Sequence, residues 1–289
     1  MATTQLATSV QQVEYALGHT SRELDRLSVQ AALLEPFTRQ LFHEAGILPG
    51  MRVLDVGCGS GDVSLLAAEI VGDYGAVVGV DRSPDAISRA SARAFLRNRS
   101  NVTFERGDLS TISFDEPFDA IVGRFVLMYQ SDPIASLKNL YRYLRPGGLM
   151  VFQEMDATSC RSYPLVPIYE DLIGWVRAAL KGTGARPEFG LELPSAFAAV
   201  GLPRPKMRID SLLAGEPEST VYEMAAEAVR SLLPMLEKLN IVSREEVQVG
   251  TLAERLRQEV LSREAIIVLY GIAGAYSRKH NSANSRAIV

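Results

Sequence analysis

The sequence lacks the features that mark several large classes of protein. Its two cysteines, Cys58 and Cys160, lie far apart and do not have the spacing of a disulfide framework or a metal site. It has no internal repeat and no run of about 18 apolar residues, which a membrane-spanning helix needs. Residues 1–12 are polar and do not resemble a signal peptide. We therefore expect a soluble, cytoplasmic protein with no membrane partner and no bound metal.

Long runs of one charge are also missing. The 30 basic and 34 acidic residues give a net charge of −4, and neither sign is concentrated in one segment. A protein whose main partner is a phosphate backbone usually carries a basic patch or stripe, so nucleic acid is not an expected partner. The 289 residues are 47% hydrophobic, which suffices for one large core with an appendage. Whether the chain forms a homodimer stays open.

Short apolar strands alternate with helical segments from Met51 to Asp156. This alternation is typical of a parallel sheet with helices on both faces. The predicted strands cover residues 52–56, 76–80, 102–105, 118–122 and 149–155. Two later candidates, 206–213 and 266–270, are expected to complete the same sheet, with helical insertions before and between them.

A helical segment precedes the first strand. Thr20 to Glu23 has the form of a capping box, so a helix should begin near Ser21. Pro36 is expected to interrupt this helix, because proline removes a backbone hydrogen bond inside a helix. A second short helix should then carry Phe37, Leu41 and Phe42 and end before Gly46.

The densest motif, Asp55-Val56-Gly57-Cys58-Gly59-Ser60-Gly61, directly follows the first predicted strand. Glycines at alternate positions allow the backbone to pass close to a ligand. In a dinucleotide-binding fingerprint the third glycine falls one residue later, where this chain has Asp62. The spacing therefore disfavours a pyrophosphate ligand and, with it, a nicotinamide-dependent dehydrogenase. We expect Cys58 to be a small buried filler in this loop.

Acidic residues follow the next two strands. Asp81 ends the second strand, where a carboxylate can accept hydrogen bonds from both hydroxyls of a ribose. Asp108 follows the third strand and could accept from the exocyclic amine of an adenine. Consecutive strand ends meet beside the point where the strand order of a doubly wound sheet reverses. The sequence therefore predicts an adenosine pocket at this edge of the sheet.

These motifs, together with Phe118-Asp119 and Leu144-Arg145-Pro146-Gly147-Gly148, resemble a class I S-adenosylmethionine-dependent methyltransferase. The resemblance covers Met51 to Asp156 and implies an α/β, Rossmann-like, doubly wound sheet of seven strands with the last one antiparallel. It also implies S-adenosyl-L-methionine as cofactor. The residues expected to bind it are Asp55, Gly57, Gly59, Gly61, Asp81, Arg82, Asp108, Leu109 and Arg124.

On this interpretation the chain divides into four parts. Residues 1–46 form an N-terminal helical cap, and residues 47–157 form the cofactor-binding core. Residues 158–278 supply the remaining strands together with helical insertions that cover the substrate, and residues 279–289 form a flexible tail.

Methyl transfer from a sulfonium is an in-line displacement, so the protein mainly aligns and desolvates the reactants. A base helps only when the acceptor carries a proton of high pKa. Four candidates for catalysis are Glu154 and Asp156 at the end of the fifth strand, and Tyr15 and His19 in the N-terminal segment. Each of the two acids could instead cap a turn.

In similar enzymes the substrate approaches over the ends of the fourth and fifth strands. Met128 and Tyr129 follow the fourth strand, and Trp175 lies in the first helical insertion. We expect these three side chains to contact the substrate, although aromatic residues at helical spacing also occur in cores.

Other methyltransferase classes fit less well. Gly123-Arg124-Phe125-Val126 does not match the Asn/Asp-Pro-Pro-aromatic element of amino-methylating DNA enzymes. The paired glutamates of protein-arginine enzymes and the acidic cluster of metal-dependent catechol enzymes are not found either. The overall arrangement instead resembles bacterial natural-product methyltransferases. This resemblance implies methyl transfer to oxygen, nitrogen or activated aromatic carbon of a small molecule in secondary metabolism. A non-catalytic S-adenosylmethionine-binding module and a nucleic-acid methyltransferase remain as alternatives.

Overall fold

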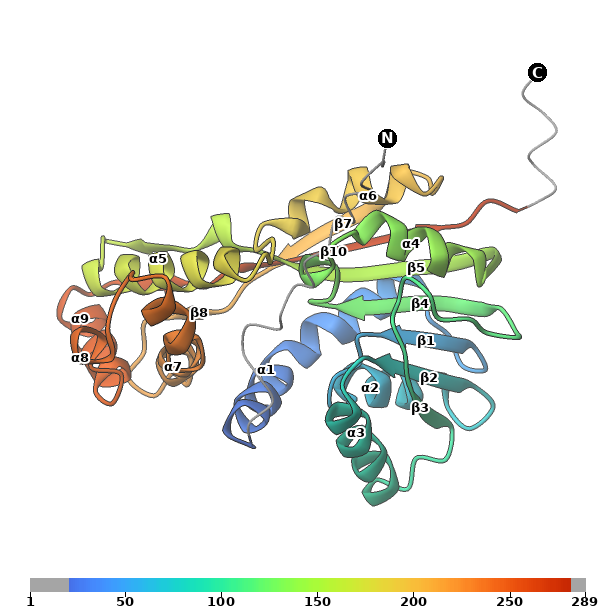
Figure 1. Cartoon of the computed structure of the whole chain (residues 1–289), viewed down its shortest axis with the longest axis horizontal. Coiled ribbons are helices and arrows are strands. Elements are labelled where there is room, and N and C mark those ends of the chain that lie inside the picture. Colours follow the sequence, from blue (N-terminus) through green and yellow to red (C-terminus); the bar gives the residue numbers. More distant parts are fainter. Residues whose placement is uncertain (1–20, 282–289) are drawn as a thin grey trace, which may run out of the picture.

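The computed structural model describes residues 21–281, with side chains from Val29 onward. A seven-stranded sheet of order β3-β2-β1-β4-β5-β10-β7 forms its centre (Figure 1). Five parallel strands come first: β1 (Arg52–Val56), β2 (Ala76–Asp81), β3 (Val102–Arg106), β4 (Phe118–Arg124) and β5 (Leu144–Asp156). β10 (Gly271–Arg278) runs antiparallel to both of its neighbours, β5 and β7 (Lys206–Asp210). The predicted seven-stranded sheet with one antiparallel strand is confirmed.

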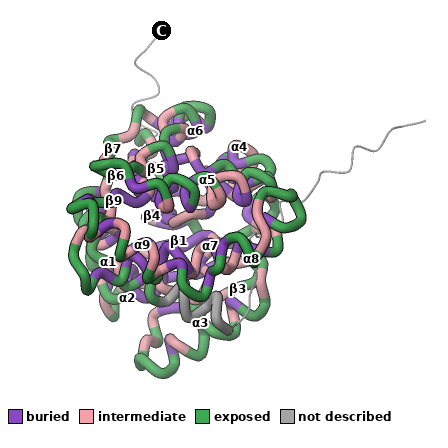
Figure 2. Tube along the Cα trace, turned by 90° about the vertical axis from the view of Figure 1, so that its left-hand side faces the viewer, coloured by how far each residue is buried: buried purple, intermediate pink, exposed green. Residues whose placement is uncertain are grey.

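Helices cover both faces of this sheet. On one face lie α1 (Ser21–Ala45), α2 (Asp62–Val71) and α3 (Pro84–Leu96), and on the other lie α4 (Pro133–Arg142) and α6 (Leu193–Ala199). β1 and β4 are therefore apolar on both faces, since Leu54 and Ile121 contribute to one core and Val53 and Val122 to the other. Figure 2 shows these strands as a buried centre enclosed by helices with exposed outer faces.

The predicted helix starts after the second and fourth strands are confirmed. Ser83 Oγ accepts from the N–H of Ala86, and Asp132 Oδ1 accepts from the N–H of Ala135 at 2.8 Å. Each cap stands directly before the proline that begins its helix. These caps fix the loops at the carboxyl edge of the sheet.

Pro36 does not interrupt the first helix, so that prediction is wrong. α1 continues through Pro36 to Ala45. Pro36 and Ala32 both lie on the exposed side of the helix, where water can satisfy the carbonyl that loses its N–H partner. The opposite side buries Leu41 and Phe42 against the sheet, and this burial outweighs the loss of one hydrogen bond.

The prediction for the last strand of the main sheet is also wrong. Residues 266–270 do not join this sheet, because β9 (Ile266–Val268) pairs with β6 (Arg161–Tyr163) and β8 (Leu213–Ala214) in a separate three-stranded sheet. The main sheet instead takes β10, whose small residues allow neighbours to pack closely. A Cβ on Gly274 would lie 3.0 Å from Leu41 Cδ1 of α1.

A smaller correction concerns the start of β5. β5 begins at Leu144, five residues before the predicted start, so Pro146-Gly147-Gly148 lies inside the strand. Pairing with β4 jumps from Phe118 with Leu144 to Ala120 with Leu149, so these residues form an irregularity in the ladder.

The remaining helices build a cap beside the sheet, at the left of Figure 1. α5 (Pro167–Gly182) packs against α7 (Val221–Lys238), and α9 (Leu252–Ser262) packs against both. The short elements are α8 (Arg244–Val247), η1 (Leu127–Tyr129), η2 (Ala157–Ser159) and η3 (Phe189–Glu192).

No helix between residues 21 and 281 is long and apolar enough to cross a membrane. The four-part division of the chain stays a prediction.

Candidate functional site

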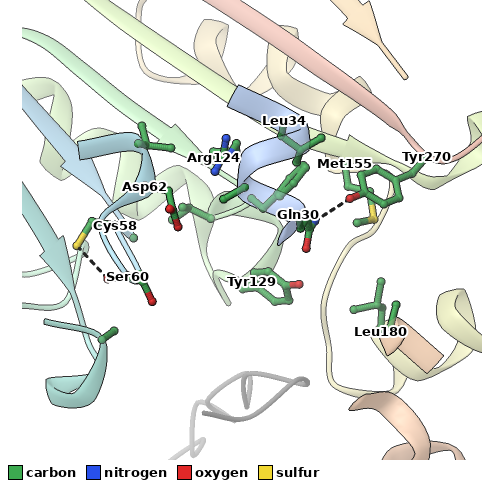
Figure 3. Close-up of a pocket in the computed structure, with 18 of the residues that line it drawn as sticks. Gln30, Leu34, Cys58, Ser60, Asp62, Arg124, Tyr129, Met155, Leu180 and Tyr270 are labelled. Carbon is green, nitrogen blue, oxygen red and sulfur yellow. Dashed lines mark hydrogen bonds between the residues drawn. The ribbon is translucent and has the colours of Figure 1, made fainter. Parts of the chain in front are cut away.

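A cavity of about 660 Å³ lies between the carboxyl edge of the main sheet and the cap. It begins beside β1 and β4, where the strand order reverses, and continues between α5 and α7. The volume falls in the range typical of small-molecule sites. Figure 3 shows Cys58, Ser60 and Asp62 at one side of this cavity, Met155, Tyr270 and Leu180 at the other, and Tyr129 between them.

The glycine loop after β1 forms one wall. Gly57, Gly59 and Gly61 all have left-handed backbone angles, with φ of +61°, +52° and +83°. A Cβ on Gly57 would lie 2.5 Å from Val126 Cγ2, whereas a Cβ on Gly59 would meet no atom within 4 Å. Gly57 and Gly59 line the cavity and Gly61 does not. The loop therefore exposes backbone to the cavity at Gly57 and Gly59.

An ion pair holds this loop in place. Arg93 of α3 contacts Asp62 at 2.6 Å and donates to the carbonyl of Ser60 at 2.6 Å. Cys58 is buried within the loop, and burial raises the pKa of its thiol. A thiol that stays protonated is a poor nucleophile, which agrees with the expected filler role.

Asp81 lies at the carboxyl end of β2 and lines the cavity. Its Oδ2 accepts from the N–H of Gly59 and its Oδ1 from the N–H of Ser83, both at 2.9 Å. Each carboxylate oxygen has two lone pairs, so both oxygens can still accept from a ligand. The geometry suits the predicted contact with a ribose.

Only some of the residues expected near the adenine line the cavity. Gly107 and Leu109 line the cavity, whereas Asp108 is partly exposed beside it. Ser110 donates to Asp108 Oδ1, and this hydrogen bond lowers the pKa of the carboxyl group. Arg82, which also lines the cavity, lies 3.7 Å from Asp108 Oδ2. Asp108 therefore stays ionised at the rim of the cavity. Because Ser110 occupies Oδ1, only Oδ2 could accept a hydrogen bond from the exocyclic amine of an adenine.

Opposite charges meet at the inner end of the cavity. Arg124 is the last residue of β4 and donates through Nη1 to Thr38 Oγ1 of α1 at 2.9 Å. Asp55 and Asp62 line the same region and act on the guanidinium electrostatically. Burial raises the pKa of Asp55 to about 7, and Ser64 donates to its carboxylate. A zwitterion fits here, because its carboxylate can bind Arg124 and its ammonium can bind an aspartate.

These features fit S-adenosylmethionine. The glycine cradle accommodates a close backbone approach, Asp81 suits the ribose, and the charged inner end suits an amino-acid group. Within the described part of the chain, no three His, Cys, Asp or Glu side chains are grouped so that they could hold a metal ion.

Glu154 is completely buried and does not line the cavity. Its Oε1 accepts from the N–H of Val126 at 3.0 Å and of Leu127 at 2.8 Å, and its Oε2 accepts from the N–H of Met128 at 3.3 Å. Burial raises the pKa of this carboxyl group to about 7. The side chain thus holds the turn after β4 from behind.

Asp156 lies two residues further along the same strand, at the end of β5. It is buried outside the cavity lining, and its Oδ1 accepts from the N–H of Thr158 at 2.9 Å. Ser159 donates to the other oxygen, so the carboxylate caps η2. The other two candidates for catalysis, Tyr15 and His19, lie outside the described residues.

Of the three residues expected to contact the substrate, only one lines the cavity. Tyr129 lines the cavity, whereas Met128 is fully buried behind it and Trp175 packs against the core outside the lining. Trp175 and Val176 are adjacent on α5, and Val176 reaches the cavity. Successive helical residues point about 100° apart, and at this spacing Trp175 points away from the face of α5 that lines the cavity. That face consists of Tyr169, Leu172, Ile173, Val176, Arg177 and Leu180.

Several lining residues were not predicted. Gln30 of α1 donates to the hydroxyl of Tyr270 at 2.7 Å, across the middle of the cavity (Figure 3). The ring of Phe125 packs edge-on against Tyr270, and Phe125 has a φ of +55°, which is unusual for a residue with a Cβ. On the cap side, Arg177 of α5 lines the cavity. No sequence motif marks Gln30, Tyr270 or Arg177, because they come from segments far apart in the sequence that only tertiary packing brings together.

Sequence comparisons identify the family of the chain. Residues 47–179 match the family model described as a methyltransferase domain. The aklanonic acid methyltransferase DauC of Streptomyces sp. (strain C5) is 33% identical over 157 residues, which are 54% of this chain and 70% of that protein. The demethylmenaquinone methyltransferase of Staphylococcus aureus (strain MRSA252) is 28% identical over 165 residues, 56% of this chain and 65% of that protein. The chain thus spans less than two thirds of the length of the latter relative.

Solved structures share the fold. The YcgJ protein of Bacillus subtilis superposes with a TM-score of 0.57 at 20% identity, covering 85% of this chain and 99% of that one. The [4+2]-cyclase SpnF gives a TM-score of 0.52 at 20% identity, covering 86% of this chain and 81% of that one. Proteins with different reactions therefore share this architecture, and a fold alone does not assign the reaction.

Proposed function

The chain belongs to the class I S-adenosylmethionine-dependent methyltransferases, and from this premise we propose that it transfers a methyl group to a small, largely apolar acceptor. The observation that carries the proposal is the continuity of one cavity. Its polar end lies at the strand edge with Asp81 and Arg124, and its other end is lined by apolar side chains of α5 and α7. A donor and an acceptor can therefore occupy the two ends and meet in the middle.

S-adenosylmethionine, when bound, supplies an electrophilic methyl group on a sulfonium. We assign Asp81 to the ribose hydroxyls, and Gly107, Asp108 and Leu109 with Arg82 to the adenine. We assign Arg124 to the methionyl carboxylate and Asp55 or Asp62 to its ammonium. These residues fix the cofactor at three points along its length, as alignment of an in-line displacement demands.

The acceptor end excludes water by apolar packing. Leu172, Ile173 and Leu180 of α5 face Met224 and Leu232 of α7 across the cavity. A low-dielectric wall of this kind favours a flat or elongated apolar molecule and removes solvent from the nucleophile. Tyr129 and Tyr270 lie between the two ends, where their hydroxyls can orient the acceptor.

Glu154 and Asp156 act, on this proposal, as positioning residues that shape the turn after β4 and the start of η2. Neither lies in the cavity wall, so neither is placed to accept a proton from the acceptor. Methylation of a ready nucleophile needs alignment more than it needs a base. Tyr15 and His19 stay candidates from the sequence.

The relatives named for demethylmenaquinone and aklanonic acid support an organic small molecule as acceptor. Placement in secondary metabolism rests on the sequence resemblance, and a cytoplasmic location and a homodimer stay predictions.

A product assay tests the proposal. The protein is incubated with methyl-labelled S-adenosylmethionine and a panel of hydroxylated naphthalenes and anthraquinones. We expect S-adenosylhomocysteine to form in step with a labelled organic product. Tight binding of the cofactor with no label transferred to any acceptor would instead favour a non-catalytic binding module.

A further inference from the structure

The acceptor end of the cavity contains a charged side chain that the proposed function does not use. Among the described residues of α5 and α7 that line the cavity, Arg177 is the only charged one. Its neighbours in the wall are Ile173, Val176 and Leu180. The Arg177 side chain is 37% exposed, so solvent screens part of its charge, but an anion held in the cavity beside it is still attracted and can accept its hydrogen bonds.

The protein itself does not fully neutralise this cation. Arg177 Nη2 lies 3.8 Å from Glu188 Oε1, which is beyond hydrogen-bonding distance. The same carboxylate oxygen lies only 2.8 Å from Lys181 Nζ, one turn further along α5. Glu188 is therefore engaged mainly by Lys181. No hydrogen bond from the guanidinium to another described residue competes for its donors.

A second lining residue lies within the electrostatic range of Arg177. Cys160 lines the cavity just after η2. Burial raises the pKa of its thiol to about 11, and the positive charge of Arg177 opposes this rise. The charge of Arg177 therefore acts on a part of the cavity wall outside its own helix.

We propose that Arg177 binds an anionic oxygen of the methyl acceptor. The acceptor is then an apolar ring system that carries a carboxylate or an ionised phenol at the end held between α5 and α7. Guanidinium groups suit such oxygens because their planar donors can form two parallel hydrogen bonds. This inference rests on the proposed function, because it assumes that the cap end of the cavity holds the acceptor.

The test compares two probes of equal size, 2-naphthoic acid and 2-naphthamide, which differ in charge. Each is titrated calorimetrically at pH 7.5 into protein saturated with S-adenosylhomocysteine. We expect the naphthoate to bind at least about tenfold more tightly than the amide, because hydrogen bonds to charged groups are the stronger ones. In Arg177→Met this preference should disappear while affinity for S-adenosylhomocysteine stays unchanged.

Lys238→Met is the matched control. It removes an exposed cation from the end of α7, but Lys238 does not line the cavity and is not one of the two cations that lie beside Glu188. The control should keep the preference for the naphthoate. Equal binding of the two probes, or a preference that survives Arg177→Met, overturns the inference. Failure of S-adenosylhomocysteine to bind at all would instead overturn the proposed function, so the two failures are distinguishable.

Discussion

Asp81 accepts a hydrogen bond from the backbone N–H of Gly59 through Oδ2, at 2.9 Å. This contact joins the end of β2 to the glycine loop that follows β1. The side chain assigned to the ribose therefore also sets the position of the loop assigned to the methionyl part. One carboxylate organises two sections of the proposed cofactor site.

We expect Asp81→Ala to weaken binding of S-adenosylhomocysteine by about 10- to 100-fold, because hydrogen bonds to a charged group contribute about 1.5–3 kcal/mol. Isothermal titration calorimetry measures the change. Asp73→Ala, in the exposed loop before β2, is the control and should bind as the wild type does. Unchanged affinity in Asp81→Ala would remove the ribose assignment.

A substitution of Arg124 should weaken the recognition of a different part of the same ligand. We expect Arg124→Met to weaken S-adenosylhomocysteine about 10- to 100-fold but to leave 5′-methylthioadenosine nearly unchanged, because the latter lacks the carboxylate that Arg124 is proposed to bind. Asp81→Ala should weaken both ligands, since both contain the ribose. Equal losses for the two ligands in Arg124→Met would show that the substitution merely disturbs the site.

The two glycines of the loop should differ in their tolerance of alanine. Both have left-handed φ angles, but only Gly57 faces Val126 at a distance that a Cβ cannot occupy. We expect Gly57→Ala to lower the free energy of unfolding by about 1–3 kcal/mol more than Gly59→Ala does, the usual cost of overpacking. Chemical denaturation measures both values. Adding Val126→Ala should recover part of the loss in Gly57→Ala, and equal stabilities of the two single variants would contradict the clash.

Glu154 should make stability depend on pH. Burial raises the pKa of its carboxyl group in the folded protein to about 7, above the value of an exposed glutamate. The folded state therefore binds this proton more tightly than the unfolded state does. Stability should fall as the pH rises from about 4.5 to about 7 and then level off.

Glu154→Gln cannot ionise, so it should lose less stability than the wild type between pH 5 and pH 8. The readout is the difference in melting temperature between the two pH values, and not the absolute value, because the amide replaces one acceptor with a donor beside Met128. The exposed substitution Glu245→Gln serves as control. An identical pH response in Glu154→Gln and the wild type would exclude this role.

The cofactor half of the molecule could be predicted from the sequence because its signals are local. The strands β1 to β4 begin at the predicted residues, and their carboxyl ends lie within two residues of the prediction. The glycine loop and the strand-end aspartate Asp81 meet at one edge of the sheet because parallel strands must end there. Local turn chemistry and strand order were enough for this part.

The acceptor half could not be predicted in the same way. β10 contains two glycines and few β-branched residues, so its strand pattern is weak, and residues 266–270 with their stronger pattern pair elsewhere. Arg177 and Tyr270 reach the cavity through contacts between segments far apart in sequence. Glu154 lies near a strand end, as Asp81 does, but its side chain points into the protein. Successive side chains of a strand point to opposite faces, so a shift of one residue in the strand decides whether a side chain faces the cavity.

A structure of the protein with S-adenosylhomocysteine tests the central claim most directly, that one cavity holds the donor at the strand edge and the acceptor under the cap. We predict the ribose hydroxyls on Asp81, the carboxylate on Arg124, and the sulfur facing the space between Tyr129 and Met155. A ligand whose amino-acid end lies between α5 and α7, with Asp81 making no contact to the ribose, would contradict the account.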